Sequence, residues 1–74
     1  MKLPAVSGKD LFNALIRNGW VEIRTGASSH RYLKHPNRGG LVTVPYTTKD
    51  LPKGTLSSIR KQAGLNADEL HQML

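Results

Sequence analysis

Hydrophobic residues near the N-terminus recur at the spacing of an α-helix. One stripe of such a helix collects the apolar side chains of Leu11, Phe12, Leu15 and Ile16. Ser7 precedes this stripe and suits the N-cap position, with Asp10 three residues later as a capping-box partner. Asn18-Gly19 follows the stripe, and glycine tolerates the left-handed conformation that many helix ends adopt. The pattern therefore predicts a helix from Ser7 to Asn18-Gly19.

Three stretches with strand-like patterns follow, over residues 20–24, 30–34 and 41–44. The first alternates, so that Val21 and Ile23 share one face and the opposite face carries Trp20, Glu22 and Arg24. Pro36 to Gly40 is typical of a turn, and Pro45 closes the third, β-branched strand. Because the connections are short, we expect the three strands to form an antiparallel meander.

The second strand divides into two unlike faces. Leu33 is the residue best suited to face a core, and the alternation places Arg31 and His35 on its side of the strand. The other face then turns outward and carries His30, Tyr32 and Lys34. A histidine, an aromatic ring and an amine on one exposed strip are suited to contact nucleic acid.

Two helices complete the chain. One spans about residues 53–63, buries Leu56 and Ile59 and ends at Gly64, while Asn66 opens a short terminal helix that docks on the body or on a partner, or frays. The order predicts an α+β fold, α-β-β-β-α plus a short C-terminal helix, with helices on one face of a three-stranded antiparallel sheet. We expect one domain over residues 1–74, with its core in 7–65 and the short helix in 66–74.

The charge of the chain is strongly positive. Eleven lysines and arginines against five acidic residues give a formal net charge of +6 over 74 residues, and the cations are spread along the chain. That distribution indicates a folded basic surface and not a disordered basic arm. It predicts a polyanionic partner, with nucleic acid first and an acidic protein second.

The composition also argues against several classes of protein. The chain has no cysteine, so it has neither a disulfide framework nor a thiol nucleophile, which fits a cytoplasmic location. Its five carboxylates are scattered and its histidines lack ligand spacing, so we expect no metal and no cofactor. No apolar run approaches the length that spans a membrane.

The strongest candidate for chemistry is His30, which follows the small-residue loop Gly26-Ala27-Ser28-Ser29 and begins the second strand. Imidazole is the side chain best suited to proton transfer near neutral pH. The residues around His30 that we expect to contact RNA are Arg24, Ser28, Ser29, Arg31, Tyr32 and Lys34. The sequence pattern alone supports a second interpretation equally well, in which His30 is a surface residue that caps the loop.

Several segments, taken together and in order, resemble the HicA family of small toxins, the YcfA-like mRNA interferases. The resemblance runs from about Ser7 to Leu65, and its matching pieces are Ser7-Gly8-Lys9-Asp10-Leu11, Asn18-Gly19-Trp20, Gly26-Ala27-Ser28-Ser29-His30, Val42-Thr43-Val44-Pro45, Lys53-Gly54-Thr55-Leu56-Ser57-Ser58-Ile59 and Lys61-Gln62-Ala63-Gly64-Leu65. It implies a fold similar to double-stranded-RNA-binding domains and metal-independent cleavage of mRNA. The implied partner is a HicB-type antitoxin that covers the active site and supplies the contacts to operator DNA.

The family's essential histidine lies in a Gly-Ser-His motif, which the resemblance carries over onto His30. Many members carry a second histidine shortly after the Val-Pro that ends the third strand, where this chain has Thr47. Any role that this second histidine has in the family is then either absent from this chain or performed by another residue, such as Tyr46. Two alternatives to a ribonuclease stay open: a non-catalytic RNA-binding domain of similar fold, and an adaptor whose basic surface pairs with an acidic protein.

Overall fold

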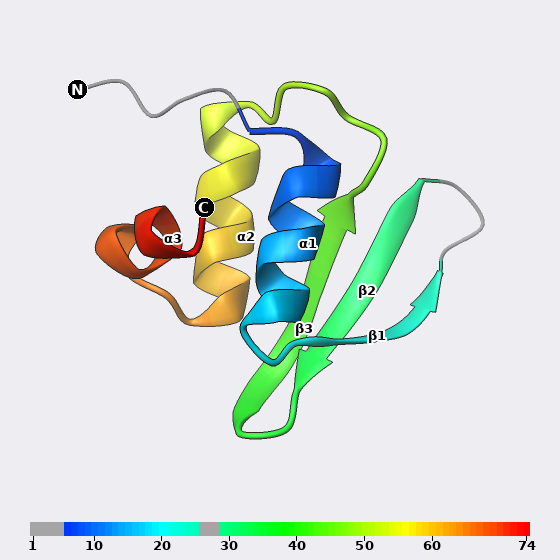
Figure 1. Cartoon of the computed structure of the whole chain (residues 1–74), viewed down its shortest axis with the longest axis vertical. Coiled ribbons are helices and arrows are strands. Elements are labelled where there is room, and N and C mark those ends of the chain that lie inside the picture. Colours follow the sequence, from blue (N-terminus) through cyan, green and yellow to red (C-terminus); the bar gives the residue numbers. More distant parts are fainter. Residues whose placement is uncertain (1–5, 26–28) are drawn as a thin grey trace.

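The structure, a computed structural model, describes residues 6–25 and 29–74 and contains three helices and three strands in these ranges. In chain order they are α1 (Gly8–Arg17), β1 (Val21–Thr25), β2 (His30–His35), β3 (Arg38–Pro45), α2 (Lys53–Ala63) and α3 (Ala67–Met73) (Figure 1). The strands form one antiparallel sheet in the order β1-β2-β3. The predicted α+β fold and its antiparallel meander are confirmed.

The helix ends lie where the local sequence predicts them. The Ser7 side chain accepts a hydrogen bond from the Asp10 backbone N–H at 3.0 Å and caps α1. Asn66 and Glu69 form a reciprocal capping box at the start of α3. Gly64 ends α2 in the left-handed conformation, with φ of 71°. Each of these signals acts within a few residues of its own position, which is why the sequence alone predicts them.

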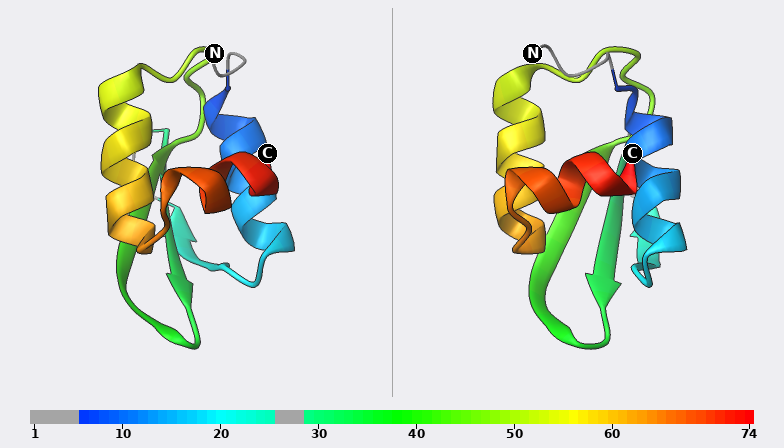
Figure 2. Two further views of the ribbon diagram at one scale, coloured as in Figure 1. Left: turned by 90° about the vertical axis from the view of Figure 1, so that its left-hand side faces the viewer. Right: turned by 60° about the vertical axis from the view of Figure 1, so that its left-hand side comes forward.

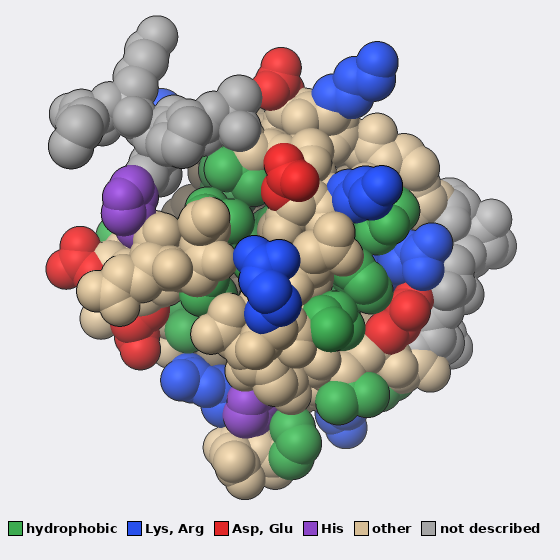
Figure 3. All heavy atoms as spheres, viewed as in Figure 1, with side chains coloured by type: hydrophobic (Ala, Val, Ile, Leu, Met, Phe, Trp, Pro, Cys, Tyr) green, Lys and Arg blue, Asp and Glu red, His purple; other side chains and the backbone are tan. Residues whose placement is uncertain are grey.

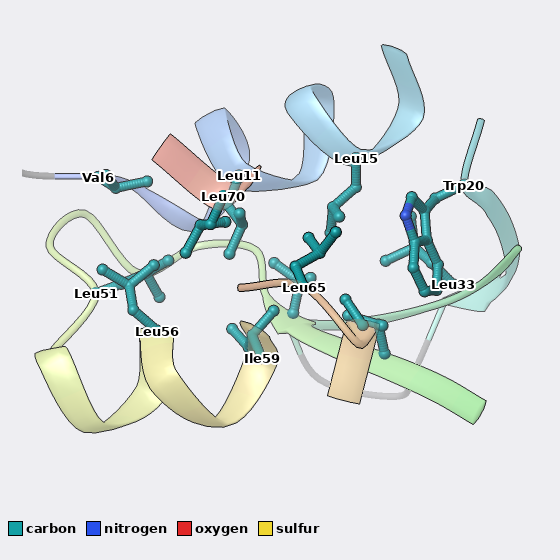
Figure 4. Close-up of a cluster of buried hydrophobic side chains, with 13 residues drawn as sticks. Val6, Leu11, Leu15, Trp20, Leu33, Leu51, Leu56, Ile59, Leu65 and Leu70 are labelled. Carbon is teal, nitrogen blue, oxygen red and sulfur yellow. The ribbon is translucent and has the colours of Figure 1, made fainter. Parts of the chain in front are cut away.

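The hydrophobic core lies between the sheet and the helices (Figure 4). Its fully buried side chains come from α1, β2 and β3, and are Leu11, Leu15, Leu33, Val42 and Val44. α3 crosses between α1 and α2 (Figure 2) and adds Leu70, so the terminal helix docks on the body. Ile16 does not belong to the core and is 41% exposed. It lies about 100° around the helix from Leu15, outside the buried arc.

Two features of the sheet differ from the prediction. A register shift between Glu22 and Arg24 pairs these two residues with the consecutive residues Leu33 and Tyr32 of β2, which interrupts the regular pairing that simple alternation assumes. β3 begins at Arg38 instead of Leu41, so the hairpin turn is shorter than Pro36 to Gly40. Arg38 pairs with His35 across the turn, and its guanidinium donates a hydrogen bond at 3.3 Å to the carbonyl of Gly64, the residue after α2.

The start of α1 is packed directly on the end of β3. A Cβ atom added to Gly8 would collide with the carbonyl of Pro45, so only glycine allows this approach. The backbone N–H of Gly8 donates to the carbonyl of Thr48 at 2.8 Å, and Leu51 N–H donates to the carbonyl of Val6 at 2.8 Å. As a result, the first turns of α1 and α2 lie at the end of the molecule where β2 begins and β3 ends (Figure 1).

Candidate nucleic-acid interface

His30 is the first residue of β2 and its side chain is exposed. It pairs with Pro45 at the end of β3, and the carbonyl of the preceding Ser29 accepts a hydrogen bond from the Tyr46 N–H at 2.9 Å. The end of β3 and the residue that follows it therefore fix the backbone at His30 and at the residue before it. An exposed, well-anchored histidine at a strand end is accessible to a large substrate.

The face of β2 that carries His30 is the face turned away from the helices. Leu33 is fully buried on the helix side, so the alternating residues Tyr32 and Lys34 point the other way with His30. Cross-strand neighbours extend this face, because Val21 pairs with Lys34 and Thr43 pairs with Tyr32. The exposed Leu41 lies next to the buried Val42 and belongs to the same face. We call it the open sheet face, made of Val21, His30, Tyr32, Lys34, Leu41 and Thr43.

The open sheet face combines polar and apolar groups. Lys34 is exposed, whereas Tyr32 is half-buried. Val21 and Leu41 are 53% and 43% exposed, which is high for large aliphatic side chains. The surface therefore offers an imidazole, an aromatic ring and a cation along β2, with the two exposed apolar groups on either side of the Lys34 end. Such a mixture suits a partner that is anionic and also buries apolar area.

Arg31 lies on the opposite face from His30, as the alternation predicts. Its guanidinium is 3.2 Å from the Glu22 carboxylate, and the Arg31 Cζ is 4.1 Å from the centre of the Tyr46 ring. The same Cζ lies 5.6 Å from the Phe12 ring centre, and the two aromatic rings meet edge to face. The sequence alone does not predict this cluster, although the alternation along residues 30–34 already places Arg31 on the same side as Leu33.

The other predicted RNA-binding residues lie around the loop before β2. Ser29 is half-buried and its carbonyl is bonded to Tyr46, whereas Ser28 lies outside the described residues. The backbone of Arg24 pairs with Tyr32, next to the open sheet face. Of the sequence-predicted set, the structure brings together His30, Tyr32 and Lys34 on one face.

Thr47 is exposed in a turn that follows β3. The turn is closed by the Thr48 N–H, which donates to the carbonyl of Pro45 at 3.2 Å. Pro45 in turn pairs with His30, so Thr47 comes just after the end of β3 that lies beside His30. Tyr46, the residue that precedes it, packs its ring against Arg31 on the helix side of the sheet.

His35, at the far end of β2, has different surroundings. Its ring meets the buried Trp20 edge to face at 5.3 Å, and its Nδ1 accepts a hydrogen bond from the Asn37 N–H at 3.1 Å. A cleft of about 940 Å³ opens beside it and is lined also by Arg17 and Arg38. Of the predicted RNA-binding residues that the structure describes, none lines this cleft.

Charged side chains of both signs are interspersed on the face of the molecule that Figure 3 shows. Lysine and arginine groups are spread across the view of Figure 3 among acidic groups, without a single basic patch. Within residues 6–25 and 29–74, no group of three or more histidine and acidic side chains is placed to hold a metal ion. In the same part of the chain, no helix is long and apolar enough to cross a membrane.

Comparison with known proteins agrees with the fold and with the sequence motifs. No curated protein matches the chain. A family model described as the HicA toxin of bacterial toxin-antitoxin systems matches residues 8–65, from the first turn of α1 to the second residue after the end of α2. The match includes all three strands and both larger helices. The chain therefore belongs to the HicA toxin family of bacterial toxin–antitoxin systems, and membership implies an antitoxin partner.

Proposed function

We propose that this HicA toxin is a metal-independent endoribonuclease that cleaves mRNA, inhibits translation and uses His30 for proton transfer. The observation that carries the proposal is the position of His30, exposed at the first residue of β2 and on the same face as Tyr32 and Lys34. The matched family is a toxin family, which favours an activity against a cellular target over a purely structural role.

RNA supplies its own nucleophile for this reaction. The 2′-oxygen attacks the adjacent phosphorus, a base takes the 2′-hydroxyl proton, and the bond from phosphorus to the 5′-oxygen breaks as an acid protonates that oxygen. His30 serves as the base or the acid, and well-placed proton transfer accelerates a reaction by about 10²–10⁴-fold. The products are a 2′,3′-cyclic phosphate and a 5′-hydroxyl, so no metal is needed to generate a nucleophile.

Neighbouring residues on the open sheet face bind the RNA. Lys34 pairs with a phosphate, and Tyr32 offers a ring surface for a base. The RNA also contacts Arg24, Ser28 and Ser29, on the loop side of His30. The N-terminal ends of α1 and α2 lie at the His30 end of the molecule and contribute partial positive charge there (Figure 1).

A HicB-like antitoxin neutralises the toxin by covering the open sheet face. Val21 and Leu41 support this proposal, because exposed aliphatic side chains gain free energy when a protein partner buries them. An antitoxin on this face excludes RNA from His30 by steric blockade. Contacts to operator DNA come from the antitoxin, so the toxin reaches DNA only indirectly.

A defined single-stranded RNA, incubated with the purified toxin in EDTA, tests this proposal. We expect cleavage that yields a cyclic phosphate and a 5′-hydroxyl. A matched RNA with a 2′-deoxy residue at the cleavage position should be bound but not cut. Salt-dependent binding of both RNAs without cleavage of either would point to a non-catalytic RNA-binding domain. Negligible RNA affinity together with tight binding of an acidic protein would point to the adaptor instead.

A further inference from the structure

Arg31 lies at the centre of a cluster that joins four parts of the chain. We call the group formed by Phe12, Glu22, Arg31 and Tyr46 the Arg31 cluster. Its contacts join β1 to β2 through the Glu22–Arg31 ion pair, and β2 to the segment after β3 through the stacking of Arg31 on Tyr46. Phe12 of α1 meets the Tyr46 ring with centres 5.2 Å apart and planes at 83°.

The cluster acts on the same two backbone segments that hold His30. Arg31 directly follows His30, and Tyr46 directly follows the Pro45 that pairs with His30. The Tyr46 N–H also donates to the carbonyl of Ser29 at 2.9 Å. Contacts before and after His30 in the chain therefore restrain its imidazole. They come from the side chains of Arg31 and Tyr46 and from the backbone of Ser29 and Tyr46.

The charge of Arg31 is directed away from the open sheet face. Its guanidinium is bonded to a carboxylate and covers an aromatic ring on the helix side, and its side chain is only 32% exposed. Lys34, by contrast, is exposed on the same face as His30. A cation that already has an acidic partner contributes less to the binding of a phosphate than an exposed one on the substrate face.

We propose that Arg31 and Tyr46 are positioning residues, which hold His30 against the end of β3 during RNA cleavage, and that Arg31 is not a phosphate ligand. The inference rests on the proposed function, in which His30 transfers a proton. Its physical basis is the steep dependence of proton transfer on geometry, since a displacement of about 1 Å can lower a rate about 10²-fold. The cluster restrains the His30 backbone without touching the substrate.

The test compares Arg31→Met, which keeps an apolar stem beside Tyr46 but removes the charge, with Lys34→Met. We expect Arg31→Met to lower kcat for a defined RNA by about 10–100-fold with KM unchanged. Lys34→Met should instead raise KM and reduce the salt dependence of RNA binding by the equivalent of one phosphate contact, a slope change of about 0.7. An Arg31→Met variant with raised KM, the same slope change and an unaltered kcat would overturn the proposal.

Glu22→Gln separates positioning from phosphate binding in a second way. This change removes the ion pair and leaves Arg31 charged. A positioning role predicts a lower kcat at unchanged KM, because the guanidinium loses an anchor. If Arg31 instead binds phosphate, its release from Glu22 should lower KM, and that result would contradict the proposal.

A control for stability is provided by Ile59→Val on α2, far along the chain from the cluster. Ile59 is buried, so this change lowers Tm without altering the contacts of Arg31. We expect Ile59→Val to retain the wild-type kcat below its Tm. An equal fall in kcat for Ile59→Val and Arg31→Met would mean that Arg31 contributes only to the general stability of the fold. That result would overturn the proposal.

Hydrogen exchange gives a readout that does not need cleavage. The Tyr46 amide should exchange faster in Arg31→Met than in the wild type, and at the wild-type rate in Ile59→Val under native conditions. Unchanged protection of Tyr46 in Arg31→Met would overturn the positioning role. Failure of the wild type to cut RNA, with faster Tyr46 exchange in Arg31→Met, would overturn the proposed function alone.

Discussion

The two histidines at the ends of β2 lie in opposite environments. His30 is exposed on the open sheet face and begins the strand, opposite Pro45. His35 ends the strand on the helix side, against Trp20, with its Nδ1 engaged by the Asn37 N–H. One imidazole is exposed at the surface, whereas the other is used in packing and in the hairpin turn. The same residue type is thus exposed at one end of the strand and has a structural role at the other.

The difference between the histidines follows from the alternation of the strand. Residues 30 and 35 are five positions apart, an odd number, so they point to opposite faces. Leu33 identifies the face of β2 that points toward the helices, because its side chain is fully buried beneath them. A histidine is therefore a candidate for catalysis here because of its register relative to one leucine, and not because of its residue type alone.

Replacing the residue that sets the faces should have the largest effect on stability. Leu33→Ala removes a fully buried side chain from the centre of the sheet, and we expect a loss of about 2–5 kcal/mol in the free energy of unfolding. Urea denaturation followed by circular dichroism measures it. The matched control is Val21→Ala on the open sheet face, which should cost far less. Similar losses for the two variants would contradict the assignment of faces.

Removal of the structural histidine should have a smaller effect. His35→Ala removes the edge contact with Trp20 and the acceptor for the Asn37 N–H, which together stabilise the fold by about 1–2 kcal/mol. We expect Tm to fall by about 4–8 °C per kcal/mol, as measured by thermal denaturation. The rate of RNA cleavage below this Tm should stay at the wild-type value. A large loss of cleavage by folded His35→Ala would remove the distinction between the two histidines.

Addition of a second imidazole near His30 should sharpen the comparison further. Thr47 is exposed in the turn after β3 and stands where many members of the family carry a histidine. We expect Thr47→His to raise kcat by about tenfold, less than the approximately 10²–10⁴-fold of a fully positioned group. Single-turnover cleavage of the same RNA measures it, with Thr47→Asn as the control. No gain would mean that the second proton-transfer group comes from elsewhere.

The parts of the fold that the sequence predicts are those set by local chemistry. Ser7, Gly64 and Asn66 mark helix ends through bonds or backbone conformations within a few residues of each. The face of His30 is equally local, because it follows from the two-residue period around Leu33. For these features, neighbouring residues contain all the information that determines the structure.

The features that the sequence misses depend on residues far apart in the chain. The hydrogen bond from the Arg38 guanidinium to the carbonyl of Gly64 joins the start of β3 to the end of α2, 26 positions away. The register shift in β1 becomes visible only when its pairing with β2 is known. Likewise, the Arg31 cluster needs Phe12 and Tyr46, which only the folded chain brings to the guanidinium. Long-range partners of this kind leave no periodic signal in a single sequence.

The central claim, that His30 performs the chemistry and His35 does not, is tested most directly by one paired measurement. Cleavage of a defined RNA in EDTA is compared for the wild type, His30→Ala and His35→Ala at a temperature where all three are folded by circular dichroism. We predict a loss of about 10²-fold or more for His30→Ala and a wild-type rate for His35→Ala. Wild-type cleavage by folded His30→Ala would contradict the claim.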